Sequence, residues 1–348
     1  MAVVFITVLA GILAAVYFSL AIQTKVHTPG ELVWKYKAEG FIISTPFAIG
    51  DTLYIGSGDN TLQAIDIETG EVRWGFKAGG PIYSSPVVED GRVYVGSHDE
   101  AMYALHVENG SIVWMFKTSG PVYSSPVISD DMVYFTSADS NLYAVDKDSG
   151  MVKWSFKTGA LIVSSPVVDG ETVYTGSCDD KVYAVDAKTG REKWSVKTGG
   201  AVVSSPVVED GVVYVGSHDS NLYAIKASTG EVLWRYAAFD FVQSSPAVYK
   251  DMVFFGSDDD SLYAVDKVSG RLVWSYHTEG GVFSSPLVHR GVVYVGAGEY
   301  AYGLGSGDGR LLWSFKADDV IYSSPRVFGD RLYIASYDGI LYAFSFAS

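Results

Sequence analysis

The chain has 348 residues, of which 48% are apolar and 19% are charged, and this composition excludes a disordered protein. The formal net charge of −15 argues against nucleic acid as a partner, because phosphate binding needs a cationic surface. Cys178 is the only cysteine, which excludes an internal disulfide and a cysteine-based zinc cluster.

The N-terminal residues predict a membrane-spanning or signal segment. Ala2 to Ile22 carry no charge and are almost continuously apolar. As a helix this stretch would be about 32 Å long, enough to cross a bilayer core of roughly 30 Å. We therefore expect residues 1–25 to form a hydrophobic leader whose helix anchors the protein in a membrane. A cleaved signal peptide is the alternative, because Ser19, Leu20 and Ala21 offer a small-x-small cleavage site.

The rest of the chain is a repeat array marked by eight tryptophans. Successive tryptophans lie 40 residues apart in six cases and 39 in one, and no tryptophan falls outside this register. This period excludes a doubly wound nucleotide-binding fold and indicates stacked supersecondary units. The tryptophans are Trp34, Trp74, Trp114, Trp154, Trp194, Trp234, Trp274 and Trp313.

Residues 81–117 show what one unit contains. Asp90-Gly91 and Asn109-Gly110 provide turn chemistry between runs of β-forming residues. Four antiparallel strands in about 40 residues predict one blade of a β-propeller. The four runs are Ile82 to Val88, Arg92 to Gly96, Met102 to Val107 and Ile112 to Lys117.

The predicted fold is all-β, an eight-bladed propeller of four-stranded antiparallel blades over residues 31–348. The chain enters the array with a fourth-strand sequence, Gly30 to Lys37, and leaves it after a third strand, Ile340 to Phe346. The N-terminal strand should therefore complete the last blade, because both edges would otherwise remain unpaired.

A motif of the form A-x-D-x-x-[TS]-G-x-x-x-W precedes four of the tryptophans, as in Ala64 to Trp74 and Ala184 to Trp194. It resembles the tryptophan-docking motif of pyrroloquinoline quinone (PQQ) repeat propellers, and the likeness covers the chain after residue 30. The Asp can bond the turn backbone, the Gly can adopt the left-handed conformation, and the Trp can fill the space between blades. Beside the tryptophans, the expected docking residues are Asp66, Asp146, Asp186, Asp266, Gly70, Gly150, Gly190 and Gly270.

The resemblance implies one of two functions. One branch of the family comprises quinoprotein dehydrogenases, which hold PQQ and Ca²⁺ on the propeller axis and stack a tryptophan on the quinone. The other comprises non-catalytic propellers such as the outer-membrane assembly lipoprotein BamB. Here every tryptophan occupies a docking position, and the repeat symmetry is nearly intact. We therefore expect a non-catalytic protein without cofactor or metal, with a PQQ- and Ca-dependent alcohol or sugar dehydrogenase as the alternative.

Departures from the repeat are the candidate contact residues. The loop Phe239-Asp240-Phe241 places two aromatic residues beside an acid, which is typical of a contact patch. Arg326 stands where the other units have an apolar residue, and we expect it to pair with a carboxylate, with a bound anion as the alternative.

A second set of candidates precedes the paired serines of each unit and should face the channel. We expect these side chains to plug the channel, although the mixed ring could also hold a flat ligand. His98 and His218 occupy equivalent loops three blades apart, too far from each other to share a metal ion. The candidates of this set are Tyr83, Tyr123, Gln243 and Tyr322.

These observations predict a membrane-anchored or secreted protein whose propeller lies outside the cytoplasm. It should act as a binding or assembly scaffold that uses one propeller face for a protein or cell-surface partner and the N-terminal segment for the membrane. A carbohydrate-binding propeller is a further alternative that no residue favours.

Overall fold

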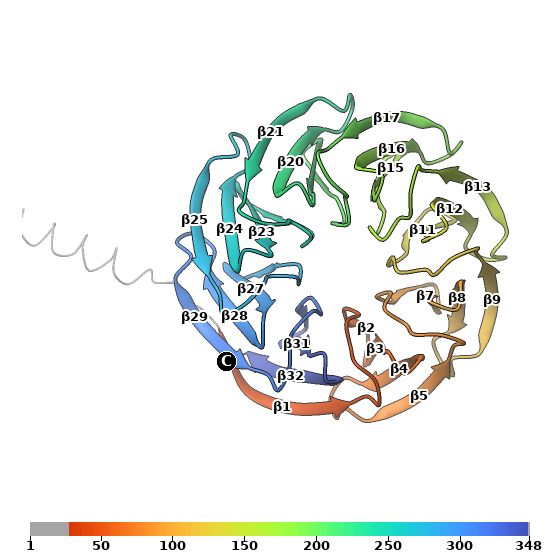
Figure 1. Ribbon diagram of the computed structural model, residues 1–348. Helices are drawn as coiled ribbons and strands as arrows, with labels where there is room; N and C mark the ends of the chain where they lie inside the picture. Colours follow the sequence, from red (N-terminus) through yellow and green to blue (C-terminus); the bar gives the residue numbers. More distant parts are fainter. Residues whose placement is uncertain (1–27, 347–348) are drawn as a thin grey trace, which may run out of the picture.

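The computed structural model describes residues 28–346, which form a closed ring of eight four-stranded antiparallel sheets (Figure 1). The predicted eight-bladed propeller is confirmed. The predicted leader, residues 1–25, and its helix lie outside the described residues. Between residues 28 and 346 there is no helix that is both long and apolar enough to span a bilayer.

Each blade runs from an inner strand beside the axis to an outer strand at the circumference. Second strands are buried on both faces because each sheet is covered by its two neighbours, and they read as runs of β-branched and aromatic residues. The inner strands are β2 (Phe47–Ile49), β6 (Val87–Glu89), β10 (Val127–Ser129), β14 (Val167–Asp169), β18 (Val207–Glu209), β22 (Ala247–Tyr249), β26 (Leu287–His289) and β30 (Arg326–Phe328). The second strands are β3 (Thr52–Gly56), β7 (Arg92–Ser97), β11 (Met132–Thr136), β15 (Thr172–Ser177), β19 (Val212–Gly216), β23 (Met252–Ser257), β27 (Val292–Ala297) and β31 (Arg331–Ala335).

The third and outer strands complete the blades. The third strands are β4 (Thr61–Asp66), β8 (Ala101–His106), β12 (Asn141–Asp146), β16 (Lys181–Asp186), β20 (Asn221–Lys226), β24 (Ser261–Asp266), β28 (Tyr300–Gly305) and β32 (Ile340–Phe346). The outer strands are β5 (Val72–Lys77), β9 (Ile112–Lys117), β13 (Val152–Lys157), β17 (Glu192–Lys197), β21 (Val232–Ala237), β25 (Leu272–His277), β29 (Leu311–Lys316) and β1 (Pro29–Lys37).

The ring is closed by strands from opposite ends of the described chain. β1 pairs antiparallel with β32, with Trp34 opposite Ala343 and Lys37 opposite Ile340. Figure 1 shows these two strands side by side at the point where the red and blue ends of the sequence meet. The predicted closure of the last blade by the N-terminal strand is confirmed.

The inner strands are shorter than the sequence predicts. Residues 82–86 are not part of a strand, and β6 begins only at Val87. The reason is that the two serines in this segment form hydrogen bonds other than those of a β-ladder. The Oγ of Ser84 accepts the N–H of Gly96 at 3.0 Å, and the N–H of Ser85 donates to the Oγ of Ser125 in the next blade at 3.1 Å.

The second serine of each pair links neighbouring blades around the channel. Seven such N–H to Oγ bonds of 2.9–3.2 Å connect equivalent residues from Thr45 to Ser324. At the eighth junction the Oγ of Ser323 donates to the carbonyl of Ser44 at 2.8 Å. The paired serines therefore bind the inner loops into a hydrogen-bonded ring.

The docking turns hold the tryptophan of the preceding blade. The carboxylate of Asp186 accepts the backbone N–H of Thr189 at 2.8 Å, which fixes the turn. Gly190 follows with φ of +69°, and a Cβ there would lie 2.7 Å from Cδ2 of Trp154. The Nε1 of Trp154 donates to the carbonyl of Ala187 at 2.9 Å. The turn therefore contacts the indole in two ways: its carbonyl accepts the Nε1 hydrogen bond, and its glycine lies against the ring face.

This arrangement recurs around most of the ring. Seven of the eight tryptophans donate Nε1 to the carbonyl of the corresponding turn. The eighth, Trp313, packs against Phe344 of the closing blade with ring centroids 5.4 Å apart. The other expected docking residues occupy the same places in their turns: Asp66, Asp146, Asp266, Gly70, Gly150 and Gly270.

The docking carboxylates predict a loss of stability in acid. Hydrogen bonds from Arg73 and from the Thr69 N–H lower the pKa of Asp66 to about 2, and bonds from the Ser149 hydroxyl and N–H lower that of Asp146 to about 2. The unfolded value is about 3.9, so this stabilisation is complete above that pH and is lost as the pH falls toward 2.

We expect the melting temperature to fall over this pH window and to fall less in a variant with all four docking aspartates changed to asparagine, which keeps an amide oxygen as acceptor. Thermal denaturation followed by circular dichroism between pH 6 and 2 measures both curves. Parallel curves would show that these carboxylates do not set the acid sensitivity.

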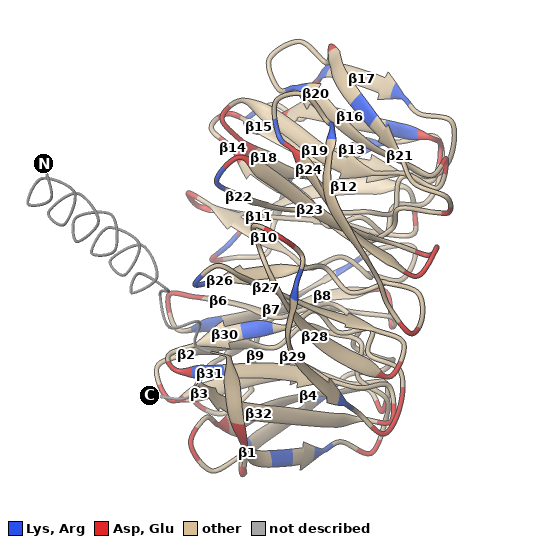
Figure 2. Ribbon diagram, turned by 90° about the vertical axis from the view of Figure 1, so that its left-hand side faces the viewer, with Lys and Arg blue, Asp and Glu red and all other residues tan. Residues whose placement is uncertain are grey.

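The two faces of the ring differ in their contacts. The loop face contains the segments that join one blade to the next and the second strand to the third, such as residues 38–46 and 57–60. The turn face contains the opposite connections, such as residues 67–71, and ion pairs join blades there, including Lys147 with Asp90 at 2.8 Å. Figure 2 shows acidic and basic residues mainly in connections and at strand ends, while the strands themselves are largely uncharged.

Candidate functional site

The channel mouth on the loop face is lined by six aromatic side chains, here called the aromatic arc. Successive ring centroids lie 4.6–6.4 Å apart, which is the range of favourable aromatic contacts. His98 fills the widest gap, 4.2 Å from both Tyr83 and Tyr123. In spatial order the arc consists of Phe283, Tyr322, Tyr337, Phe41, Tyr83 and Tyr123.

The rings of the arc line the mouth without plugging it. Tyr123, Tyr322 and Tyr337 are 36%, 38% and 40% exposed. The predicted candidates Tyr83, Tyr123 and Tyr322 thus belong to one arc. With the blades numbered by their inner strands, from blade one (β2) to blade eight (β30), the arc runs over blades seven, eight, one, two and three. The expectation of a plug is wrong for this part of the ring.

The hydroxyls of the arc are free to bind a ligand. Across residues 28–346, no hydrogen bond forms at the hydroxyl of Tyr83, Tyr123, Tyr322 or Tyr337. Burial raises the pKa of Tyr83, and the neighbouring phenols of Tyr337 and Tyr123 raise it further. A phenol hydroxyl can both donate and accept a hydrogen bond.

Sequence reasoning missed Phe41 and Tyr337, and it considered His98 only as a metal ligand. Phe41 lies two residues before the predicted channel position, where most blades have a smaller residue. Tyr337 and His98 occupy the middle of the Ser-x-Asp turn. Comparing these two further repeat positions would have shown the same departures from symmetry.

A second group of side chains, here called the blade-six cluster, lies on the same face. The ring of Phe241 stacks on His218 with centroids 4.5 Å apart and planes 11° apart. The amide of Gln243 donates to both carboxylate oxygens of Asp258, at 2.8 and 2.6 Å. Phe239 projects from the loop with 90% of its surface exposed. The structure thus brings together the predicted Phe239, Asp240, Phe241 and Gln243, with His218 and Asp258 beside them.

The blade-six cluster is acidic and held in place by its backbone. The N–H of Phe239 donates to the Asp259 carboxylate at 2.8 Å, so the exposed ring stands on an anchored main chain. Burial raises the pKa of Asp258, and repulsion from Asp240 and Asp259 acts in the same direction, against the Gln243 hydrogen bond.

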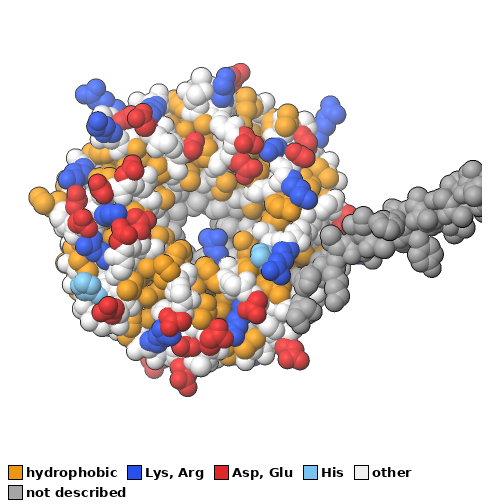
Figure 3. Space-filling model, turned by 180° about the vertical axis from the view of Figure 1, so that it is seen from behind, with side chains coloured by type: hydrophobic (Ala, Val, Ile, Leu, Met, Phe, Trp, Pro, Cys, Tyr) orange, Lys and Arg blue, Asp and Glu red, His pale blue; other side chains and the backbone are white. Residues whose placement is uncertain are grey.

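Arg326 begins the inner strand β30 and is the only Lys or Arg on the eight inner strands. No carboxylate in residues 28–346 pairs with it, so the expected ion pair is wrong. The residue is exposed to solvent, and the protein atoms around the guanidinium lower its pKa. Figure 3, which shows the molecule from the side opposite to Figure 1, shows the central opening of the ring and acidic and basic side chains spread over the surrounding face.

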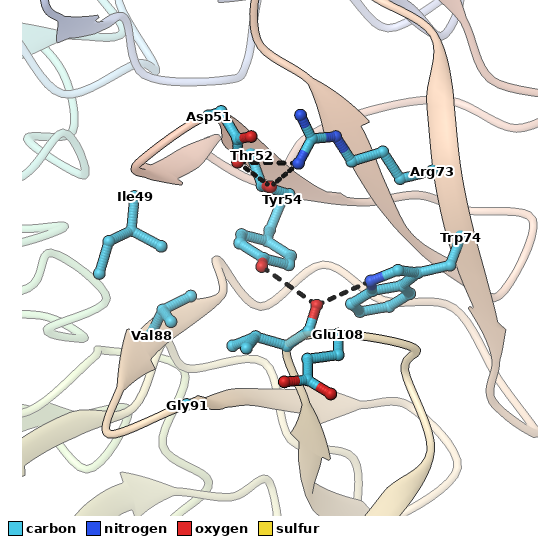
Figure 4. Close-up of a pocket in the computed structure, with 10 residues that line it drawn as sticks. Ile49, Asp51, Thr52, Tyr54, Arg73, Trp74, Val88, Gly91 and Glu108 are labelled. Atoms are coloured by element: carbon cyan, nitrogen blue, oxygen red, sulfur yellow. Dashed lines mark hydrogen bonds and ion pairs between the residues drawn. The ribbon is translucent and has the colours of Figure 1, made fainter.

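Grooves between blades on the turn face are a consequence of tryptophan docking. One groove of about 340 Å³ is lined by Tyr54, Arg73 and Trp74 among others (Figure 4). Its guanidinium is already paired with Asp51 at 2.8 Å and Asp66 at 2.6 Å. Similar grooves lie at the equivalent places between blades eight and one and between blades three and four. Because the same groove recurs at several blade junctions, none of the three is a unique binding site.

Comparisons with known families agree with this geometry. A propeller model described as "Beta-alanine-activating enzyme, beta-propeller" matches residues 6–212. A PQQ-repeat model described as "Outer membrane protein assembly factor BamB" matches residues 179–297 and 278–348. The chain belongs to the PQQ-repeat β-propeller family. No curated protein matches the sequence.

Three solved PQQ-type or designed propellers show how general the fold is. BamB from Moraxella catarrhalis superimposes with a TM-score of 0.79 at 20% identity, over 91% of this chain and 97% of BamB. The computationally designed Ika8 protein gives 0.82 at 15% identity, over 91% and 100% of the two chains. A europium-containing methanol dehydrogenase gives 0.78 at 13% identity, over 90% and 93%. At these identities the likeness establishes the fold alone.

The residues at the axis do not fit a calcium-bound quinone. Calcium needs six to eight oxygen ligands, whereas the described residues contain no group of three or more His, Cys, Asp or Glu placed to hold a metal ion. All eight tryptophans lie on outer strands, so none can stack on a ligand in the channel. The carboxylate of Asp258 is already engaged by the channel candidate Gln243.

Proposed function

We propose that the protein is a non-catalytic binding or assembly scaffold that holds a protein partner on its loop face. The match to the family model named for an outer membrane protein assembly factor supports this reading, as does the structural likeness to BamB. We further propose that the propeller lies outside the cytoplasm and is tethered to a membrane through the apolar stretch between Ala2 and Ile22.

The observation that carries the proposal is the exposed aromatic loop of blade six. A phenylalanine that is 90% exposed leaves a large apolar surface in water, which favours burial against a partner. The loop is anchored by backbone hydrogen bonds, so little conformational entropy is lost when a partner covers it. An anchored aromatic side chain of this kind is typical of the residues that dominate protein interfaces.

Changing both Phe239 and Phe241 to alanine should weaken partner binding about tenfold or more. A photoreactive residue placed at position 239 should form cross-linked adducts in native membranes, and the double variant should capture less of the same partner. The melting temperature should change little, because both side chains are exposed, Phe239 at 90% and Phe241 at 42%.

Val268→Ala provides the matched control, because Val268 is 78% exposed but lies on the turn face. It should leave capture unchanged, and a photoreactive residue at position 268 should give no adduct with that partner. Equal capture by the double variant and the wild type would refute the loop-face assignment. Unfolding of the double variant would show that these rings are structural.

A further inference from the structure

Arg326 is a cation without a carboxylate partner among residues 28–346, at a position where the other blades are apolar. The equivalent positions of the other blades hold apolar residues: Phe47, Val87, Val127, Val167, Val207, Ala247 and Leu287. The guanidinium is exposed to solvent and has no carboxylate partner among residues 28–346, so its charge is available to an anion from outside. A single cation retained at such a position is therefore suited to an anion that enters from outside.

The aromatic arc is centred on the same side of the channel. Tyr322 lies four residues before Arg326 on the inner segment of blade eight, a separation of about 13 Å if extended. Tyr337 of the same blade contacts Tyr322 on one side and Phe41 of blade one on the other, with centroids 5.5 and 4.6 Å away. Two exposed rings of the arc, Tyr322 and Tyr337, thus belong to the same blade as the unpaired guanidinium.

We propose that this channel mouth binds an extended peptide segment with one carboxylate, which pairs with Arg326 while neighbouring apolar side chains lie on the aromatic arc. The proposal rests on the proposed scaffold function and deepens it by naming the chemistry of one bound segment. The carboxylate is a Glu or Asp side chain or a chain terminus, because the planar guanidinium can bind each of them through two parallel hydrogen bonds.

Charge and length favour this ligand over other anions. One guanidinium balances one carboxylate, whereas a nucleic acid or polyphosphate needs a cationic surface that a chain of net charge −15 does not offer. Tyr322 and Arg326 are four residues apart in the chain, so a bound segment of up to about four extended residues is long enough to reach both, and its amides can bond the free tyrosine hydroxyls. Flat aromatic faces also pack well against proline and aromatic side chains.

Selection from a library of random heptapeptides with free C-termini tests the proposal. The purified full chain is immobilised, and the same library is passed over Arg326→Val, in which blade eight has the residue found in four other blades. We expect the wild type to enrich peptides with a carboxylate beside aromatic or proline residues, and the variant to lose that enrichment. Equal enrichment on both proteins, or enrichment without acids, would overturn the proposal.

Binding of the selected peptide then provides a thermodynamic cycle. Arg326→Val should weaken binding about tenfold to a hundredfold, and exchanging the acid of the peptide for its amide should weaken binding to the wild type equally. The two changes together should cost no more than either alone. Arg326→Lys should bind with intermediate affinity because it keeps the charge and loses the paired geometry. Additive losses in the cycle would show that Arg326 does not contact the carboxylate.

The variant's stability gives an independent readout. Arg326→Val should melt at the same temperature as the wild type or higher, since it removes an unpaired cation. A clear decrease would mean that Arg326 supports the fold, which contradicts its role as a ligand site. If only the peptide proposal fails, Arg326→Val should still capture the partner through Phe239. If the wild type itself captures no partner through Phe239, the scaffold function is disproved.

Discussion

Replacing Trp154 by alanine is expected to lower the free energy of unfolding by about 3–5 kcal/mol. The indole packs beside Tyr134, with centroids 5.8 Å apart, and lies against Gly190 of the next blade. Its loss would leave a cavity between two blades and an unbonded carbonyl at Ala187. Urea denaturation followed by circular dichroism measures the change.

Two variants separate the parts of this effect. Trp154→Phe keeps most of the ring contact and loses the Nε1 hydrogen bond, so it should cost about 1–2 kcal/mol. Met151→Ala is the matched control, because Met151 lies in the neighbouring turn and is 68% exposed, and it should change stability by less than about 0.5 kcal/mol. An alanine variant at Trp154 as stable as the control would refute the docking role.

Removing β1 should abolish cooperative folding of the ring. Deletion of residues 29–37 would expose the edge of β32 and remove Trp34, whose Nε1 bonds the turn of blade one at Ile67. We expect the truncated chain to aggregate or to melt broadly at a much lower temperature, as measured by calorimetry and light scattering.

A permuted chain provides the control for this deletion. Residues 29–37 attached behind Phe346 through a short linker should restore a sharp transition, because the strand can reach the same edge of β32 from either end of the chain. A truncated chain that melts like the intact protein would show that closure contributes little. Failure of the permuted chain alone would point to the linker and would be checked by lengthening it.

The fold was predictable because each repeat obeys the same local rules. The spacing from Trp74 to Trp114 and the turn residues Asp90-Gly91 and Asn109-Gly110 all depend on structure within or between adjacent blades. The extent of the inner strands was not predictable in this way. Ser84 and Ser85 lie in a β-forming run, yet their hydrogen bonds run to β7 and to the next blade instead of along a ladder.

The candidate contact residues were predictable only in part. Departures from symmetry pointed to Phe239, Gln243 and Arg326, and the structure places each on the loop face or the channel wall. The sequence did not show that Arg326 lacks a carboxylate partner in residues 28–346. Acids occur on other inner strands, but these strands belong to different blades, and their distance from Arg326 cannot be read from the sequence. Which acid can reach a cation depends on side-chain directions around the axis.

The sequence by itself determined the number of blades, the docking of seven of the eight tryptophans and the closure by the N-terminal strand, because these depend on residue spacing that repeats about every 40 residues; Trp313 packs on Phe344 instead of a docking turn. Only the tertiary structure decided that Phe283, Tyr322, Phe41 and Tyr83 form one continuous arc. These residues lie far apart along the chain, and closing the ring between β1 and β32 makes the last blade a neighbour of the first.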